Sequence, residues 1–216
     1  MQPSLKLLSV NIGKRSRIVV GQEAVDTGIF KEPVGAPVQV SALGLESDAV
    51  VNKKYHGGPD QALYLYSEAD YRWWAGQLGR ELAPGLYGEN LTVSDFGTAT
   101  PRIGDRYRIG EVLLEVTAPR IPCSVFAAKM GDPAFAKTFA KARRPGLYVR
   151  VLETGMLRAG MAMELIPAAP ENPEVLELFD FWLGKERDPE MAKRFLASPV
   201  AERDRSNLEE LVRKSG

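Results

Sequence analysis

The chain has 216 residues with 28 basic and 28 acidic side chains, so it can bury a sizeable core but has no net field to attract nucleic acid or an anionic membrane. Its single cysteine and single histidine exclude an intramolecular disulfide and metal sites built from several such residues, which favours a reducing compartment. No apolar run approaches a membrane span and the N-terminal segment lacks the apolar core of a secretory signal, so we expect a soluble, cytoplasmic protein.

Up to residue 166, the sequence predicts mainly short strands separated by glycine and proline. "LLSVNIG" predicts a strand whose apolar face contains Leu8, Val10 and Ile12. Further strands are expected in "ALYLY" (62–66) and in "RYRIGEVLLEV", a hairpin with Gly110 and Glu111 at its turn. Ser67 is suited to cap a helix over "EADYRWWAGQL", and helical patterns also cover "SVFAAKM" and "PAFAKTFAKA".

The pattern changes at "PAAPENP" (167–173), whose three prolines indicate a linker. Three amphipathic helices are expected beyond it, the second with an Asp188 cap followed by Pro189. We therefore expect a β domain over 1–166 and a three-helix domain over 171–216 that depends on the β domain for stability. Evenly spaced short strands with frequent turns favour a β-barrel or sandwich decorated by helices.

Cys123 is the first candidate for chemistry. A lone cysteine more often serves as a small buried apolar residue. Here Arg120 lies three positions earlier and would stabilise a thiolate, and Pro122 fixes the backbone before the sulfur. A helix that starts directly after Cys123 would add its positive end. Cys123 is therefore either buried filling or a reactive or metal-binding sulfur at a strand-to-helix junction.

Three other segments contain residues suited to binding. "NKKYHGGPDQALYLY" combines lysines and His56 with Gly57 and Gly58, whose freedom to adopt positive φ lets the backbone approach a ligand. "LYGENLTV" contains Asn90 just before a strand, and "PGLYVRV" predicts a strand with one outward arginine, Arg150. Each segment alone has a structural explanation, because glycine pairs form turns and lysines are solvated.

Together and in this order, the segments resemble the MOSC domain family, which is related to the C-terminal domain of molybdenum cofactor sulfurase. The strings that carry the resemblance are "TGIFKEPV", "LGLESD", "KKYHGGPDQAL", "YGENLTV", "GDRYRIG", "APRIPC" and "GLYVRV". The helices after residue 170 resemble the small three-helix (3-alpha) domain of the YiiM-like branch. Two positions depart from the family pattern: Ser47 stands where glycine is usual before Asp48, and Asn52 where an acidic residue is usual, which puts a cofactor role for Asp48 in doubt.

The resemblance implies a mainly β fold with some α: a closed, mostly antiparallel β-barrel with peripheral helices that holds the molybdenum cofactor, Mo-molybdopterin. Cys123 would be the catalytic residue and the protein ligand to the metal, since a soft thiolate suits molybdenum already held by dithiolene sulfurs. The pterin phosphate requires cations and backbone amides. The candidate cofactor-binding residues are Lys31, Lys54, His56, Gly57, Gly58, Asn90, Arg120 and Arg150.

The resemblance also implies reductive chemistry, in which hydroxylaminopurines, amidoximes and similar N-hydroxylated compounds become amines or amidines. Electrons would come from a separate reductase protein, since the sequence has no flavin, nicotinamide or iron–sulfur motif. The expected partners are this reductase and a small N-hydroxylated substrate, without nucleic acid or membrane. A homodimer is one candidate assembly.

Two other functions would use the same residues. The chain could bind and hand over molybdenum cofactor without turnover of its own, which the sequence leaves open. It could also be a metal-free thiol enzyme that pairs Cys123 with His56. We rank the thiol enzyme last, because a cysteine–histidine dyad does not require the arginine, the two lysines and the glycine pair.

Overall fold

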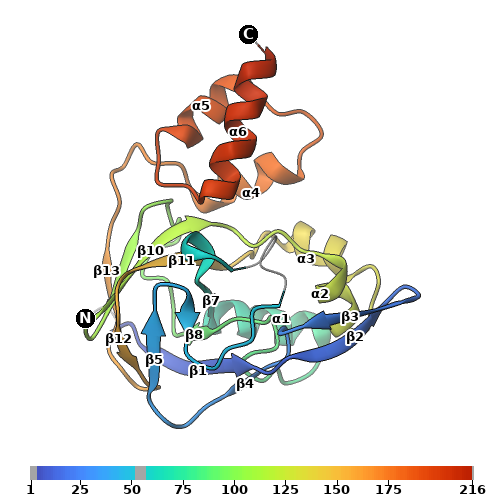
Figure 1. The fold of residues 1–216 in the computed structure, drawn as a ribbon, viewed down its shortest axis with the longest axis vertical. Coiled ribbons are helices and arrows are strands. Elements are labelled where there is room, and N and C mark those ends of the chain that lie inside the picture. The colour runs from blue at the N-terminus through green and yellow to red at the C-terminus, as the bar shows by residue number, and fades with distance from the viewer. Residues whose placement is uncertain (1–3, 52–56, 216) are drawn as a thin grey trace.

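The computed structural model describes residues 4–51 and 57–215. Its largest sheet has eight strands (Figure 1), in the order β13 (Glu164–Ile166), β9 (Arg106–Ile109), β10 (Val112–Ala118), β11 (Leu147–Glu153), β7 (Leu63–Ser67), β8 (Leu91–Val93), β1 (Leu7–Gly13) and β4 (Lys31–Pro33). Neighbouring strands are antiparallel except β7 and β8, which are parallel. The parallel pair requires a long connection between its strands, and this connection contains helix α1 (Glu68–Leu78).

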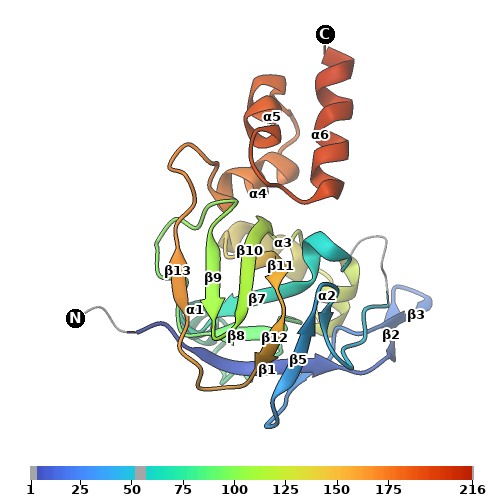
Figure 2. The same cartoon turned by 60° about the vertical axis from the view of Figure 1, so that its left-hand side comes forward.

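Two smaller sheets flank the large one, as the turned view in Figure 2 shows. One has three strands in the order β12 (Gly155–Leu157), β5 (Val38–Ser41) and β6 (Gly44–Leu45). The other is a hairpin of β2 (Ser16–Val20) and β3 (Glu23–Thr27) that packs against α2 (Ser124–Lys129). The strands thus belong to separate sheets.

The predicted closed barrel is wrong. Closure requires the outer strands of a sheet to hydrogen-bond to each other, but β13 and β4 lie at opposite ends of the strand order and pair only with β9 and β1. The edge strand β4 has three residues and ends at Pro33, which has no amide hydrogen to donate to a further strand. The strands therefore form open, mixed sheets.

Two of the helices begin at the caps that the sequence predicts. The Ser67 hydroxyl accepts a hydrogen bond from the Asp70 amide at the start of α1, and Gly79 ends that helix with φ 64°. Asp188 caps α5, as predicted. The other helices are η1, a short 3-10 helix (Pro59–Gln61), α3 (Phe135–Ala142), α4 (Val175–Leu183), α5 (Pro189–Leu196) and α6 (Glu202–Ser215).

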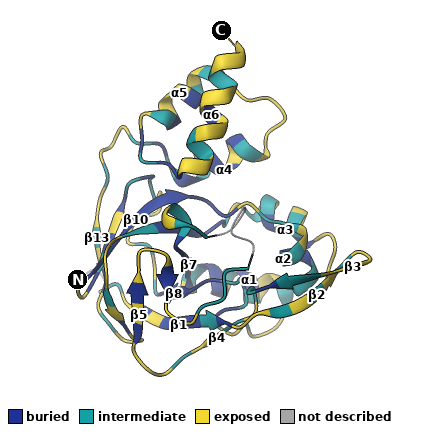
Figure 3. Ribbon diagram, viewed as in Figure 1, coloured by how far each residue is buried: buried dark blue, intermediate teal, exposed yellow. Residues whose placement is uncertain are grey.

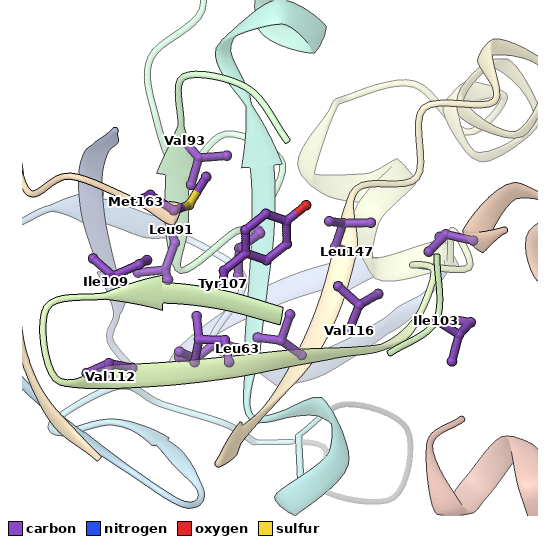
Figure 4. Close-up of a cluster of buried hydrophobic side chains, with 14 of the residues drawn as sticks. Leu63, Leu91, Val93, Ile103, Tyr107, Ile109, Val112, Val116, Leu147 and Met163 are labelled. Atoms are coloured by element: carbon purple, nitrogen blue, oxygen red, sulfur yellow. The ribbon is translucent and has the colours of Figure 1, made fainter. Parts of the chain in front are cut away.

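Two hydrophobic clusters hold these elements together. The larger one lies against the main sheet, and Figure 4 shows Leu63, Leu91, Tyr107 and Val116 among its side chains. The second cluster is mostly aromatic and lies between the sheet and α1 to α3; its large, fully buried members are Tyr64, Tyr66, Trp74, Tyr87, Phe126 and Phe139. Figure 3 shows the contrast between the buried β10 and the exposed outer face of α6.

The helical tail, residues 175–215 with α4 to α6, shares its core with the strands. Leu178, Phe195 and Leu208 belong to the same hydrophobic cluster as the main sheet. The backbone amide of Val175 also donates to Pro101 O at 2.8 Å, and that of Ala201 donates to Thr117 O at 3.1 Å. The tail is therefore held to the β part by backbone hydrogen bonds as well as by the shared core.

The predicted apolar face of β1 is wrong at its first residues. Leu8 is 36% exposed, whereas Leu7 and Asn11 are fully buried. A register shift between Leu7 and Ser9 in the pairing with β8 interrupts the alternation of the strand. The buried polar residues are satisfied locally, since Ser9 Oγ donates to Asn11 Oδ1 at 2.7 Å.

Among the described residues, no helix is both long and apolar enough to span a membrane.

Candidate functional site

Cys123 lies at the predicted junction between a strand and a helix. β10 ends at Ala118, and Cys123 is the extended N-cap residue of α2, with φ −130° and ψ 170°. Its side chain is half-buried and packs against the aromatic cluster. The sulfur is thus held on a short, proline-containing connection close to the core.

A cavity of about 210 Å³, called here the inner cavity, lies on one side of Cys123. Its wall combines loop residues with Tyr64 of β7 and Tyr148 of β11. Five of the predicted site residues line it: Lys31, Gly57, Asn90, Arg120 and Cys123. The fold therefore brings together residues that are separated by more than ninety positions in the sequence.

Arg120 provides a buried positive charge in the wall of the inner cavity. It is only 3% exposed, and its guanidinium lies 5.0 Å from the ring centre of Tyr64 and 4.4 Å from that of Phe126. Nη1 donates a hydrogen bond to Tyr87 O, whereas Nε has no partner among the described residues. Burial lowers the pKa of Arg120, but Tyr148, Tyr64 and Cys123 raise it overall, so the guanidinium stays charged.

Lys31 and Asp48 form a buried ion pair in the same wall. Lys31 Nζ lies 2.6 and 2.7 Å from the two carboxylate oxygens, and the side chains are 8% and 3% exposed. The carboxylate also accepts hydrogen bonds from Gly13 N at 2.8 Å and from Asn90 Nδ2 at 2.9 Å. Asp48, whose role the sequence left in doubt, therefore positions two of the predicted binding residues.

Two further ionisable groups lie near this wall and were missed in the sequence. Lys129 Nζ donates to Ile29 O at 2.9 Å and to Gly85 O at 2.8 Å, and burial lowers its pKa to about 7. Glu89 is fully buried, and burial raises its pKa although its Oε1 accepts hydrogen bonds from Tyr71 Oη and Gly85 N, both at 2.6 Å. No motif marks Lys129, whereas Glu89 lies next to Asn90 in "LYGENLTV".

The glycine pair adopts the predicted backbone conformation. Gly57 and Gly58 have φ 89° and 84°, and a Cβ at Gly57 would lie 2.5 Å from Val50 Cγ1. Gly57 lines the inner cavity. Two of the predicted binding residues, Lys54 and His56, lie outside the described residues, as does Asn52.

Arg150, another predicted binding residue, lies outside the wall of the inner cavity. Its side chain does not line the inner cavity but forms ion pairs with Asp60 at 3.1 Å and Glu115 at 3.5 Å. Nη2 also donates to Pro199 O at 3.1 Å and Val200 O at 3.2 Å, just before α6. Arg150 thus connects β11 to the helical tail.

Cys123 also lines a second cavity of about 490 Å³, called here the outer cavity. The two cavities share four residues: Gln61, Cys123, Val125 and Tyr148. The remaining wall of the outer cavity comes from the connection before α2 and from α4 and α6 of the helical tail. Cys123 therefore lines both a chamber with a buried arginine in its wall and a larger one that the tail completes.

This arrangement suits a bound group that carries negative charge and that can be ligated by a sulfur atom. Arg120 supplies fixed positive charge, the backbone at Gly57 approaches closely, and Cys123 supplies sulfur. The outer cavity leaves room for a second molecule next to the same sulfur.

Comparisons with known proteins identify the family and the fold. The chain is 33% identical to the uncharacterized protein YflK of Bacillus subtilis over 165 residues, which cover 76% of this chain and 75% of the relative. It is 31% identical to protein YiiM of Escherichia coli over 67% of this chain and 66% of the relative. It is also 32% identical to a protein named reductase from Gibberella moniliformis over 74% of this chain, which spans only 29% of that relative.

Solved structures show the same fold. The crystal structure of YiiM from Geobacillus stearothermophilus aligns with a TM-score of 0.78 at 24% identity, over 96% of this chain and 99% of that one. The structure of YiiM from Escherichia coli aligns with a TM-score of 0.74 at 22% identity, over 99% and 95%. The alignments include the helical tail. The model of the MOSC domain matches residues 52–164, and with the relatives above this shows that the chain belongs to the MOSC domain family.

Proposed function

We propose that this protein is a molybdenum-cofactor oxidoreductase that reduces N-hydroxylated compounds to amines or amidines. The observation that carries the proposal is the position of Cys123 on the wall shared by the inner and outer cavities. One cavity can hold a cofactor against the sulfur while the other admits a small molecule. Membership of the MOSC domain family and the name of the fungal relative support the same chemistry.

The residues of the inner cavity fit the cofactor. Arg120 is buried with an Nε that has no acceptor among the described residues, so it can donate to a phosphate or pterin oxygen. Gly57 and Gly88 have positive φ and keep side chains out of this wall. Cys123 would supply the thiolate ligand, and the molybdenum cofactor, when bound, would supply the two-electron redox chemistry.

The remaining residues would orient the bound groups. Because Lys31 is paired with Asp48, it would hold the cavity wall in position and leave contacts with phosphate mainly to Arg120. The overall reaction consumes two electrons and two protons, breaks the N–O bond and releases the oxygen as water. The proposed electron source is a separate reductase protein, consistent with the missing redox motifs in the sequence.

Molybdenum content and turnover together test the proposal. Wild type, Cys123→Ala and Cys123→Ser would be purified from a host that makes the cofactor, and wild type also from a host that cannot. Molybdenum would be measured by elemental mass spectrometry, and turnover of a hydroxylaminopurine and of benzamidoxime with reduced methyl viologen as donor. We expect near-stoichiometric molybdenum only from the competent host, and a loss of turnover of about 100-fold or more in both variants.

Two results would contradict the proposal in different ways. Bound molybdenum without turnover of either substrate would indicate a cofactor carrier. A folded wild type without molybdenum from the competent host would leave the metal-free thiol enzyme, which alkylation of Cys123 as a function of pH would then test.

A further inference from the structure

The outer cavity has a wall that the MOSC family resemblance does not account for. Three of its lining residues, Arg203, Asp204 and Asn207, come from α6, and Trp182 comes from α4. All four belong to the helical tail, whereas Cys123 and Tyr148 line the cavity from the β part. The tail therefore closes a chamber beside the sulfur as well as covering the strands.

The α6 residues face the cavity because the start of that helix is fixed. The backbone amide of Ala201 donates to Thr117 O, and that of Glu202 donates to Asp60 Oδ2 at 2.8 Å. Positions 203, 204 and 207 then lie on one side of the helix, since residues three and four apart are neighbours on its surface. Leu208, which belongs to the main core, fixes the rotation of the helix.

Asp204 is an unusual residue in this wall because its carboxyl is partly buried beside Trp182. Burial raises its pKa to about 6, while Arg203 and Trp182 lower it to a smaller extent. The indole N–H of Trp182 is itself buried and makes no well-aligned hydrogen bond within the described part of the chain. The Asp204 carboxyl, together with an indole N–H that has no well-aligned acceptor among the described residues, is suited to receive a polar ligand.

The other walls indicate the shape and charge of that ligand. Trp182, Tyr148 and the proline-rich connection from Pro119 to Pro122 offer flat, mostly apolar surfaces. Arg203 and Asp204 are adjacent and opposite in charge, so the chamber favours neither a cation nor an anion strongly. A volume of about 490 Å³ is within the range of pockets that bind small molecules.

We propose that the outer cavity is the substrate pocket and that the helical tail recognises the substrate. An uncharged, planar nitrogen heterocycle would lie against Trp182 and Tyr148 and donate its N–H edge to Asp204. This inference rests on the proposed function, and it assigns substrate specificity to α4 and α6. Asp204 would act as a binding residue that orients the N-hydroxyl group toward the side of Cys123.

Binding of adenine to the full-length protein tests the pocket without any turnover. Adenine has the shape and N–H edge of a reduced hydroxylaminopurine, and its Kd would be measured by isothermal titration calorimetry. We expect Asp204→Leu to raise Kd about tenfold or more through the loss of the acceptor, and Asp204→Asn to stay within about threefold because it keeps an oxygen acceptor. Glu209→Gln, an exposed change on the same helix outside the cavity, is the matched control and should not change Kd.

The kinetic counterpart separates this inference from the proposed function. In protein that contains molybdenum, Asp204→Leu should raise KM for a hydroxylaminopurine about tenfold and leave kcat within about threefold. If turnover is present but KM does not change, the pocket assignment is wrong and the reductase stands. If adenine binds with the expected dependence on Asp204 but no substrate is reduced, the reductase is wrong and the pocket stands.

Adenine that fails to bind, or that binds all variants equally, overturns the inference. Should Asp204→Leu fail to fold, Trp182→Phe provides the second test, since it keeps an aromatic ring in the wall and removes the indole N–H together with the five-membered ring. Trp182→Phe is expected to weaken adenine binding about threefold or more, and an unchanged Kd in that variant likewise overturns the inference.

Discussion

Replacement of Asp48 by asparagine should destabilise the protein far more than its place in a loop suggests. The side chain is nearly isosteric, so packing is retained, but the negative charge is lost. Lys31 would remain buried without its counter-ion, and the amide nitrogen of the new side chain would face another donor. The Asp48 carboxylate now accepts from Lys31, Gly13 and Asn90, and an amide cannot satisfy all three.

The expected magnitude follows from the burial of the pair. Both side chains are less than 10% exposed, 8% for Lys31 and 3% for Asp48, so water cannot replace the missing partner. Breaking a buried ion pair from one side costs about 3–5 kcal/mol, a large part of the 5–15 kcal/mol that typically stabilises a folded protein. For a chain of this length, the loss corresponds to a Tm lower by about 6 to 20 °C.

The defect should also depend on pH in a defined direction. Burial lowers the pKa of Lys31, and Asp48 opposes that effect. Without Asp48 the pKa of Lys31 falls further below the ordinary lysine value. Between these two pKa values the unfolded chain binds more protons than the folded one, so this pH window becomes wider. Stability rises with pH throughout that window. The stability lost in Asp48→Asn should therefore diminish as the pH is raised from 7 toward 10.

Urea denaturation at several pH values, followed by tryptophan fluorescence, provides the assay. Lys31→Met/Asp48→Asn should be more stable than Asp48→Asn alone, because the unpaired charge is gone. Glu68→Gln, which breaks the exposed pair with Arg72, is the control and should cost less than about 1 kcal/mol. A loss below about 1 kcal/mol in Asp48→Asn, or a double variant no more stable than it, would refute the reasoning.

Two other changes test the surroundings of the site. Ser47→Gly should stabilise the protein by about 1 kcal/mol, because Ser47 has φ 66°, a conformation that glycine adopts without strain; an unchanged midpoint in urea would show that the strain is absent. Lys129→Met should remove part of the rise in stability with pH above 7, since burial lowers the pKa of Lys129 to about 7 while the unfolded chain retains the ordinary value. Below about pH 6, where Lys129 is protonated in both the folded and the unfolded state, the variant and the wild type should have the same slope of unfolding free energy against pH. A difference in slope there would contradict the assignment to Lys129.

Local elements could be predicted because each has a local signal. The Ser67 cap, the Gly110 turn with φ 59° and the Asp188–Pro189 helix start lie within a few residues of the structure that they determine. The closure of the sheet could not be predicted in the same way, because it depends on which strands become neighbours. The pattern of short strands and turns before residue 166 is compatible with a closed barrel and with the open sheets observed.

The residues of the candidate site also differ in how well they could be predicted from local sequence. Cys123, Arg120 and Asn90 were predicted from segments that together resemble a known family, and all three line the inner cavity. Asp204 carries no such signal, since an aspartate in a charged helix is ordinarily a solvated residue. Its burial arises only because α6 packs against residues near Asp60 and Thr117, more than eighty positions earlier.

The separation of the two cavity walls has a functional consequence. Tyr64 and Tyr148 come from paired strands at the centre of the main sheet, so part of the inner wall is held by hydrogen-bonded strands. Trp182 and Asp204 come from the helical tail and do not line the inner cavity. If the outer cavity is the substrate pocket, changes in the tail should alter substrate preference while molybdenum content stays at the wild-type level, because the Arg120 and Cys123 wall is untouched. Loss of molybdenum on changing Asp204 would instead mean that the tail and the cofactor wall form a single site.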